Sequence, residues 1–192
     1  MAILESQLER WARHIEAQNA QRAHHSIRTA LEGYTEWPDG VKYEVYLQGS
    51  YRNDTNIRGD SDVDLVVQLN STFYYSNLTD EQKRRFRFTT ARYRWEDFRN
   101  DVLRALREHY GPGRIQEGKK SLKVRTSYLP ADVVVCLQYR HYPLNPRDEN
   151  DFVEGMTFYV PAENRWVINY PKLHYKKGVE KNQNTDGKYK PT

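Results

Sequence analysis

Residues 60–69 read Asp-Ser-Asp-Val-Asp-Leu-Val-Val-Gln-Leu, and this stretch decides the fold. Side chains alternate along a β-strand, so Asp62 and Asp64 share one face while Val63 and the apolar residues in step with it share the other. The apolar set predicts a strand over 62–69 with one face in the core. Two neighbouring carboxylates repel each other unless a cation neutralises them, and oxygen-only ligands favour Mg²⁺ or Mn²⁺ over zinc.

A second strand is predicted just upstream, over 41–47, and it ends at Gln48-Gly49-Ser50. Glycine lets the backbone approach an anion closely, and the amide and hydroxyl groups of such a turn can hold phosphate oxygens. A Gly-Ser pair alone is a weak signal, but this one lies twelve residues before Asp62, which makes it specific. We therefore take Gln48, Gly49 and Ser50 as candidate nucleotide-binding residues, with a plain strand-end role as the alternative for Gln48.

A third acid, Asp132, begins an otherwise apolar strand predicted over 131–142. An acid at such a position is normally excluded from a core. On a strand next to the first two acids, it would complete a metal site and help to deprotonate an attacking hydroxyl group. The alternative is a strand-end carboxylate in water.

The remaining pattern predicts helices and further strands around these motifs. Apolar residues at three- and four-residue steps predict helices over 1–33 and 80–110, the second ended by Gly111-Pro112-Gly113. Residues 70–77 have the composition of a connector. Strands are also predicted over 119–128 and in a hairpin that joins 156–160 to 165–170. This order of elements indicates an α/β sandwich with a mixed sheet.

The net charge of +4 in 192 residues comes from one end of the chain. Residues 172–192 hold six lysines against two acids, and the other 171 residues balance 24 basic against 24 acidic side chains. The neutral body argues against a stable nucleic-acid complex.

The sequence also excludes a membrane protein. The most apolar run, Val133 to Leu137, is far shorter than the roughly 20 residues of a membrane span, and the first residues lack the apolar region of a signal peptide. The single cysteine, Cys136, cannot form an intrachain disulfide, which fits a cytoplasmic protein.

Three stretches together resemble one family. They are 48–57 (Gln-Gly-Ser-Tyr-Arg-Asn-Asp-Thr-Asn-Ile), 60–67 (Asp-Ser-Asp-Val-Asp-Leu-Val-Val) and the later segments 155–161 and 166–174. The first two resemble the signature of the nucleotidyltransferases of the polymerase-beta superfamily. With the later segments, the chain is most similar to the bacterial CD-NTases, relatives of cyclic GMP-AMP synthase that make cyclic oligonucleotide second messengers in anti-phage defence (CBASS).

The resemblance implies a polymerase-beta-like core, with a mixed, mostly antiparallel sheet flanked by two long helices. It also implies phosphoryl transfer from nucleoside triphosphates with two Mg²⁺ (or Mn²⁺) ions and release of pyrophosphate. Asp62 and Asp64 would bridge the two ions, and Asp132 would ligate the second. Ser50, with the Gly49 backbone, would hold the terminal phosphates.

By the same resemblance, residues 1–171 form the catalytic lobe, made of the helix over 1–33 and the sheet and helix over 41–171. Residues 172–192 form a Lys-rich junction toward a helical lobe that the family has and this chain lacks. A regulatory protein or self-association would then complete the pocket. Two alternatives stay open: a nucleotide- or partner-binding domain without turnover, and a simple transferase that modifies a protein, RNA or small molecule.

Overall fold

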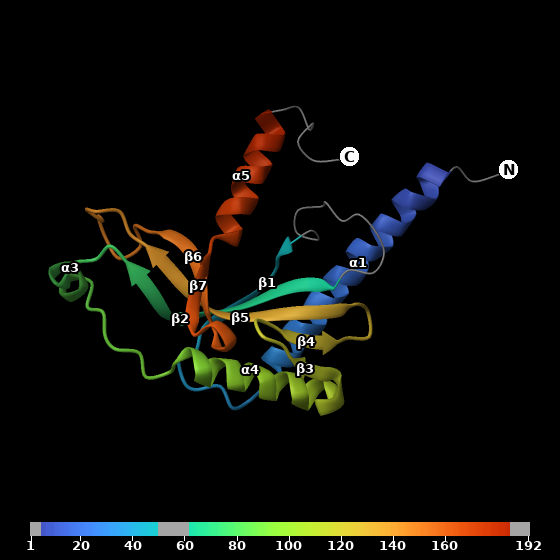
Figure 1. The fold of residues 1–192 in the computed structure, drawn as a ribbon, viewed down its shortest axis with the longest axis horizontal. Coiled ribbons are helices and arrows are strands. Elements are labelled where there is room, and N and C mark those ends of the chain that lie inside the picture. Colours follow the sequence, from blue (N-terminus) through green and yellow to red (C-terminus); the bar gives the residue numbers. More distant parts are fainter. Residues whose placement is uncertain (1–4, 50–61, 185–192) are drawn as a thin grey trace.

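The computed structural model describes residues 5–49 and 62–184, which form both helices and strands (Figure 1). In chain order they are α1 (Glu5–Glu32), β1 (Tyr43–Leu47), β2 (Val63–Ser76), α3 (Asp80–Arg85), α4 (Trp95–Tyr110), β3 (Ile115–Glu117), β4 (Leu122–Arg125), β5 (Pro130–His141), β6 (Val153–Val160), β7 (Arg165–Asn169) and α5 (Pro171–Asn184), with short 3-10 turns at Pro112–Arg114 and Pro161–Glu163. The predicted α/β class with a mixed sheet is confirmed.

The seven strands form one sheet that branches along β5. Its main path is β1-β2-β5-β4-β3, and β6 pairs with both β5 and β7. Only β2 and β5 are parallel, and the other pairs are antiparallel. On the side away from β2, β5 pairs with β4 along its first residues and with β6 along its last. The two ends of β5 therefore have different neighbours.

The helices α1 and α4 cover one face of this sheet, as Figure 1 shows. The apolar side chains of α1 recur at helical spacing, and those of β2 alternate, so both present one buried stripe to a common core. The fully buried members include Ala23, Ile27, Leu31, Val63, Leu65, Val67, Leu69, Phe98, Val102 and Leu106. The opposite face of β2 carries Asp64, Val66 and Gln68 by the same alternation.

The single helix predicted over 80–110 is wrong, because the chain breaks it into α3 and α4. Arg87 has a φ of 55°, which is incompatible with a continuing right-handed helix. The flanking Phe86 and Phe88 instead pack against Tyr142, with ring centroids 6.0 and 6.4 Å apart. Tertiary packing of the aromatic rings has overridden the local helical pattern.

The connector predicted over 70–77 is also wrong, because β2 continues to Ser76. Its register against β5 shifts between Leu69 and Phe73, and pairing then resumes from Phe73 to Ser76. The polar Asn70 and Ser71 lie in this irregularity, which explains why the sequence there looks like a turn. The two backbone amides bond to the carbonyl of Lys42 instead.

Two features of the structure bear on the environment of the protein. Within residues 5–49 and 62–184, no helix has both the length and the apolar character needed to cross a membrane. Cys136 is fully buried on β5, and this burial raises the pKa of its thiol well above the ordinary value. The thiol is therefore a core group and not a nucleophile.

Candidate active site

Two of the predicted acids face each other across the parallel pair of strands. In the register of β2 and β5, Asp64 is directly opposite Asp132. In the antiparallel pair of β4 and β5, Lys123 is opposite Asp132. The Lys123 ammonium nitrogen lies 3.8 Å from Asp132 Oδ1 and 3.6 Å from Asp62 Oδ2. Three acids and one lysine thus meet on the sheet face that α1 and α4 leave uncovered.

The carboxylates of Asp62, Asp64 and Asp132 repel one another. Asp64 keeps part of its surface exposed, but burial is still the largest cause that raises its pKa above the ordinary value, followed by the charges of Asp132 and Asp62. Asp132 Oδ1 is buried and accepts no hydrogen bond. A buried carboxylate oxygen without a donor is costly, so the arrangement is suited to a cation beyond the one lysine.

The turn after β1 lies directly against this group. The backbone amide of Gln48 donates a 2.8 Å hydrogen bond to the carbonyl oxygen of Asp64. Gly49 has a φ of 70°, and a Cβ at this position would overlap the Asp64 carboxylate. Glycine is therefore required both by backbone conformation and by space. Ser50, the third predicted residue of this turn, lies outside the described residues.

The donor set fits a hard divalent cation. The three carboxylates supply only oxygen ligands, which Mg²⁺ and Mn²⁺ prefer, and one of those oxygens lacks any donor. In the described part of the chain, no three Asp, Glu, His or Cys side chains already converge as a metal site. Side-chain rotations of Asp62, Asp64 and Asp132 would be needed to gather the ligands, and the Lys123 ammonium lies beside two of them.

A cavity of about 420 Å³ opens beside the acids. Its lining includes Asp62 and Asp132 together with the cationic Arg114, Lys123 and Arg125. Cations that line a cavity next to a carboxylate group can hold an anionic ligand that would otherwise be repelled by the acids.

These cationic residues were missed by the sequence argument, although a signal for one of them was present. Residues 119–128 and 131–142 were both predicted as strands, and the short gap between them indicates a hairpin. The hairpin is a partial signal only, because pairing back from the predicted gap would put Ser127 opposite Asp132. The wider turn between Arg125 and Pro130 in the structure puts Lys123 there instead. For Arg114, which precedes β3, the sequence offered no comparable signal.

Comparison with protein families and with curated proteins gives consistent matches. The family model described as "Nucleotidyltransferase domain" matches residues 30–149. A cyclic UMP-AMP synthase from Rhodothermus marinus is 62% identical over 192 residues, which are 100% of this chain and 66% of that protein. The cyclic nucleotide synthase CdnE01 from Staphylococcus haemolyticus is 41% identical over 155 residues, 78% of this chain and 52% of that protein.

Solved structures agree with this. The Rhodothermus marinus CdnE c-UMP-AMP synthase, solved with Apcpp and Upnpp, superposes with a TM-score of 0.83 at 59% identity, and covers 97% of this chain and 63% of that one. The Elizabethkingia meningoseptica CdnE cyclic dinucleotide synthase, solved with GTP and Apcpp, has a TM-score of 0.65 at 27% identity, with 97% and 62% covered. The chain thus spans about half to two thirds of the length of these relatives.

Proposed function

This chain belongs to the nucleotidyltransferase domain family, as a CD-NTase, and on that premise we propose that it is the catalytic lobe of a cyclic oligonucleotide synthase. The product would be a second messenger of anti-phage defence, as the resemblance to CD-NTases implies. The protein would act in the cytoplasm.

The observation that carries the proposal is the pairing of Asp64 with Asp132 on two parallel strands, with Asp62 alongside. Asp132 Oδ1 is buried without a hydrogen-bond donor, and the pKa of Asp64 is raised by burial and by both other acids. Carboxylates that repel one another lower the stability of the fold. This cost supports a binding role for the three acids toward divalent cations.

The proposed reaction is a nucleotidyl transfer. A hydroxyl oxygen of one nucleotide attacks the α-phosphorus of another, the bond to pyrophosphate breaks, and the hydroxyl proton passes to Asp132. Two Mg²⁺ or Mn²⁺ ions, held by Asp62, Asp64 and Asp132, would neutralise the triphosphate and lower the pKa of the attacking hydroxyl. A second round at the same site closes the ring.

The chain's own groups would bind and orient the triphosphate. The Gly49 backbone lies against Asp64, so phosphates held by the turn at residues 48–50 would be delivered beside the acids. Ser50 would contribute its hydroxyl group to the terminal phosphates, as expected from the sequence. Arg114 and Arg125, in the neighbouring cavity, would offset the negative charge of the pyrophosphate leaving group.

The relatives' names suggest the substrates. A cyclic UMP-AMP synthase uses one pyrimidine and one purine nucleotide, and its structure holds Apcpp and Upnpp. Because this chain is 62% identical to that synthase along its whole length, we propose ATP and UTP as its nucleoside triphosphate substrates.

The experiment that tests the proposal measures binding and turnover separately. The chain is incubated with Mn²⁺ or Mg²⁺ and labelled ATP and UTP, products are separated by chromatography, and Mn²⁺ binding is followed by electron paramagnetic resonance. The variant Asp62→Asn with Asp64→Asn should lose product and Mn²⁺ binding together. The matched control Asp39→Asn, an exposed aspartate remote in sequence from the site, should retain both.

Unchanged Mn²⁺ affinity in the double variant would overturn the role of the acids. Tight Mn²⁺ and nucleotide binding without product would instead favour the second candidate, a nucleotide-binding domain without turnover. The observation in favour of that candidate is that, among the residues the structure describes, no three acidic side chains already converge as a metal site.

A further inference from the structure

A second polar cluster lies on the same sheet face as the acids, at the first turn of α5. Its centre is Gln68, which is four residues beyond Asp64 on β2 and therefore in phase with it, about 13 Å further along the strand. Gln68 has only 1% of its surface exposed. A buried amide of this kind requires that its donors and acceptors be satisfied within the protein.

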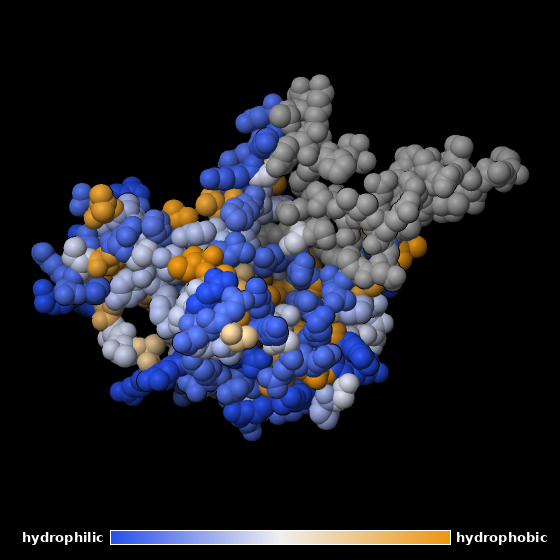
Figure 2. Space-filling view, viewed as in Figure 1, coloured by the Kyte–Doolittle hydropathy of each residue, from blue (hydrophilic) through white to orange (hydrophobic). Residues whose placement is uncertain are grey.

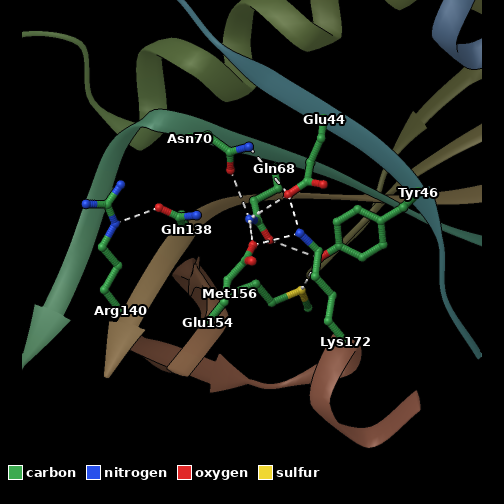
Figure 3. Close-up of polar contacts among 9 residues, drawn as sticks. All are labelled: Glu44, Tyr46, Gln68, Asn70, Gln138, Arg140, Glu154, Met156 and Lys172. Atoms are coloured by element: carbon green, nitrogen blue, oxygen red, sulfur yellow. Dashed lines mark hydrogen bonds and ion pairs between the residues drawn. The ribbon is translucent and has the colours of Figure 1, made fainter. Parts of the chain in front are cut away.

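Figure 3 shows how the cluster satisfies Gln68. Its amide nitrogen has three acceptors within hydrogen-bond distance, which share its two N–H groups: Glu44 Oε1 at 3.0 Å, Glu154 Oε1 at 2.8 Å and Asn70 Oδ1 at 2.9 Å. Its amide oxygen accepts the Tyr46 hydroxyl at 2.9 Å. Strands β1, β2 and β6 are thereby joined through one side chain.

Lys172, in the first turn of α5, adds the helix to this cluster. Its ammonium group donates to Glu44 Oε1 and, at 2.7 Å, to Glu154 Oε1. Its side chain is 30% exposed, and its nitrogen lies 5.1 Å from the centroid of the Tyr46 ring. Burial alone would lower the pKa of Lys172, but the hydrogen bonds with Glu154 and Glu44 outweigh it and raise the pKa. One cation thus holds two carboxylates that come from opposite parts of the sheet.

Beyond its first residue, every α5 residue whose exposure is described is at least partly exposed. Of the helix residues whose exposure is described, Pro171 alone is buried, and Lys176, Lys177 and Glu180 are exposed. Figure 1 shows the helix rising away from the sheet, on the side opposite α4, and Figure 2 shows mostly hydrophilic residues on the part of it that is in view. At 1.5 Å per residue its 14 residues are about 21 Å long, so a tilt of about 10° at the first turn displaces the far end by about 4 Å.

We propose that Lys172 is a positioning residue, which fixes the direction of α5 and thereby the wall that the base and sugar of a bound nucleoside triphosphate meet. This inference rests on the proposed function, because it assumes that the phosphates lie at Asp62, Asp64 and Asp132. Lys172 itself touches neither phosphate nor metal. Its effect passes through Glu44, Glu154 and Gln68 to the helix that they anchor.

The first experiment measures the position of the helix. Nitroxide labels at Glu108→Cys on α4 and Glu180→Cys on α5, both exposed, report the distance between the two helices, and the fully buried Cys136 stays unlabelled. We expect one narrow distance distribution in the parent protein and a broadened one in Lys172→Met. Lys172→Arg should restore a narrow distribution, because it keeps the charge. The matched control Lys176→Met should leave it unchanged.

A charge-balanced variant covers the case in which Lys172→Met fails to fold. The parent cluster has two carboxylates and one ammonium, and Lys172→Met leaves both carboxylates without the cation. Lys172→Met combined with Glu154→Gln restores the net charge of the parent cluster but not the ion pairs between Lys172 and the two glutamates. This double variant should fold and should still show the broadened distribution.

The second experiment separates positioning from general damage. Affinities for Mg²⁺-tripolyphosphate and for a Mg²⁺ complex of a non-hydrolysable ATP analogue are measured by calorimetry. We expect the double variant to bind the nucleotide about tenfold more weakly, which is about 1.4 kcal/mol, and tripolyphosphate unchanged. Tripolyphosphate carries no base or sugar, so the position of α5 does not affect it.

Three results would overturn the inference: an unchanged distance distribution, an unchanged nucleotide affinity, or an equal loss for both ligands, which would indicate damage to the whole lobe. Failure of the proposed function has a different signature. In that case the parent protein binds neither tripolyphosphate nor nucleotide, while the label distances still decide whether Lys172 fixes α5.

Discussion

The carboxylate of Asp64 occupies the space that any side chain at Gly49 would need. Gly49 lies in the turn after β1 and Asp64 lies on β2, and the backbone hydrogen bond from Gln48 to the Asp64 carbonyl holds the turn against β2. The turn that is expected to hold phosphate therefore has its position set by one of the expected metal ligands. Each of the two motifs constrains the other.

Gly49→Ala should consequently displace Asp64. The new methyl group overlaps the carboxylate, so we expect the Mn²⁺ affinity to fall by about tenfold or more, about 1.4 kcal/mol, as measured by electron paramagnetic resonance. Gly40→Ala is the matched control. Gly40 also has a positive φ, of 79°, but a Cβ there meets nothing within 4 Å.

The control should therefore lose about 1 kcal/mol of stability from backbone strain and keep its Mn²⁺ affinity. Equal Mn²⁺ affinities in Gly49→Ala and Gly40→Ala would show that the close approach to Asp64 has no role in the site.

Lys123 is expected to compete with a divalent cation. Its ammonium lies 3.6 and 3.8 Å from the Asp62 and Asp132 carboxylates, so in the absence of metal it partly offsets their repulsion. Lys123→Met should then increase Mn²⁺ affinity about threefold or more and lower the thermal stability of the metal-free protein. Lys123→Arg, which keeps the charge, should behave like the parent. A lower Mn²⁺ affinity in Lys123→Met would contradict this competition.

The three acids could be predicted because each gives a local signal. Asp62 and Asp64 stand in phase on an apolar strand, and Asp132 interrupts another. Parallel pairing of β2 and β5 brings Asp64 and Asp132 together, and the need for a third acid at a metal site leads us to expect neighbouring strands. The comparisons confirmed the family that these residues suggested.

The Lys172 cluster could not be predicted, because its members are far apart in the sequence. Glu44 lies 128 residues before Lys172, and no spacing rule links them. In the sequence Lys172 is one of six lysines in a Lys-rich segment, which is typical of a solvated junction. Only the branching of the sheet at β5 brings β1, β2 and β6 close enough for one ammonium group to reach Glu44 and Glu154.

Removing Asp132 should change the ionisation of Asp64. After burial, the charge of Asp132 is the largest cause that raises the pKa of Asp64, so Asp132→Asn should lower that pKa toward its ordinary value of 3.8. A carboxyl with a raised folded pKa stabilises the fold below its unfolded pKa and loses this effect as pH rises through the folded pKa. The metal-free variant should therefore melt higher than the parent at pH 7, with a smaller difference near pH 3.

Nuclear magnetic resonance of the Asp64 carboxyl carbon measures the pKa directly, and thermal unfolding in a chelator measures the stability. An unaltered Asp64 titration in Asp132→Asn would contradict the coupling of the two acids. The exposed Asp39→Asn serves as the control for both measurements.

The contacts between Lys172 and Glu154 that hold α5 should weaken at low pH. The direction of the Glu154 pKa shift shows why. Burial raises the pKa of Glu154, but hydrogen bonds from Lys172 and Gln68 outweigh it, so the folded pKa lies below the ordinary value of 4.5. Its contribution to stability is therefore present above pH 4.5 and is lost as pH falls through the folded pKa. The pKa of Lys172 is raised above 10.5, so its charge stays constant over this range.

Glu154→Gln should accordingly cost about 1–2 kcal/mol near pH 7, which lowers the melting temperature by about 2–8 °C, and the cost should shrink as the pH falls through the folded pKa of Glu154. Thermal unfolding of both proteins from pH 3 to pH 8 gives this difference. Glu149→Gln, at an exposed position, should show no such pH dependence. A protonated Glu154 and a glutamine are both uncharged, so the stability difference between the variant and the parent should shrink in acid. A stability difference that does not change with pH would mean that the charge of Glu154 does not hold the helix.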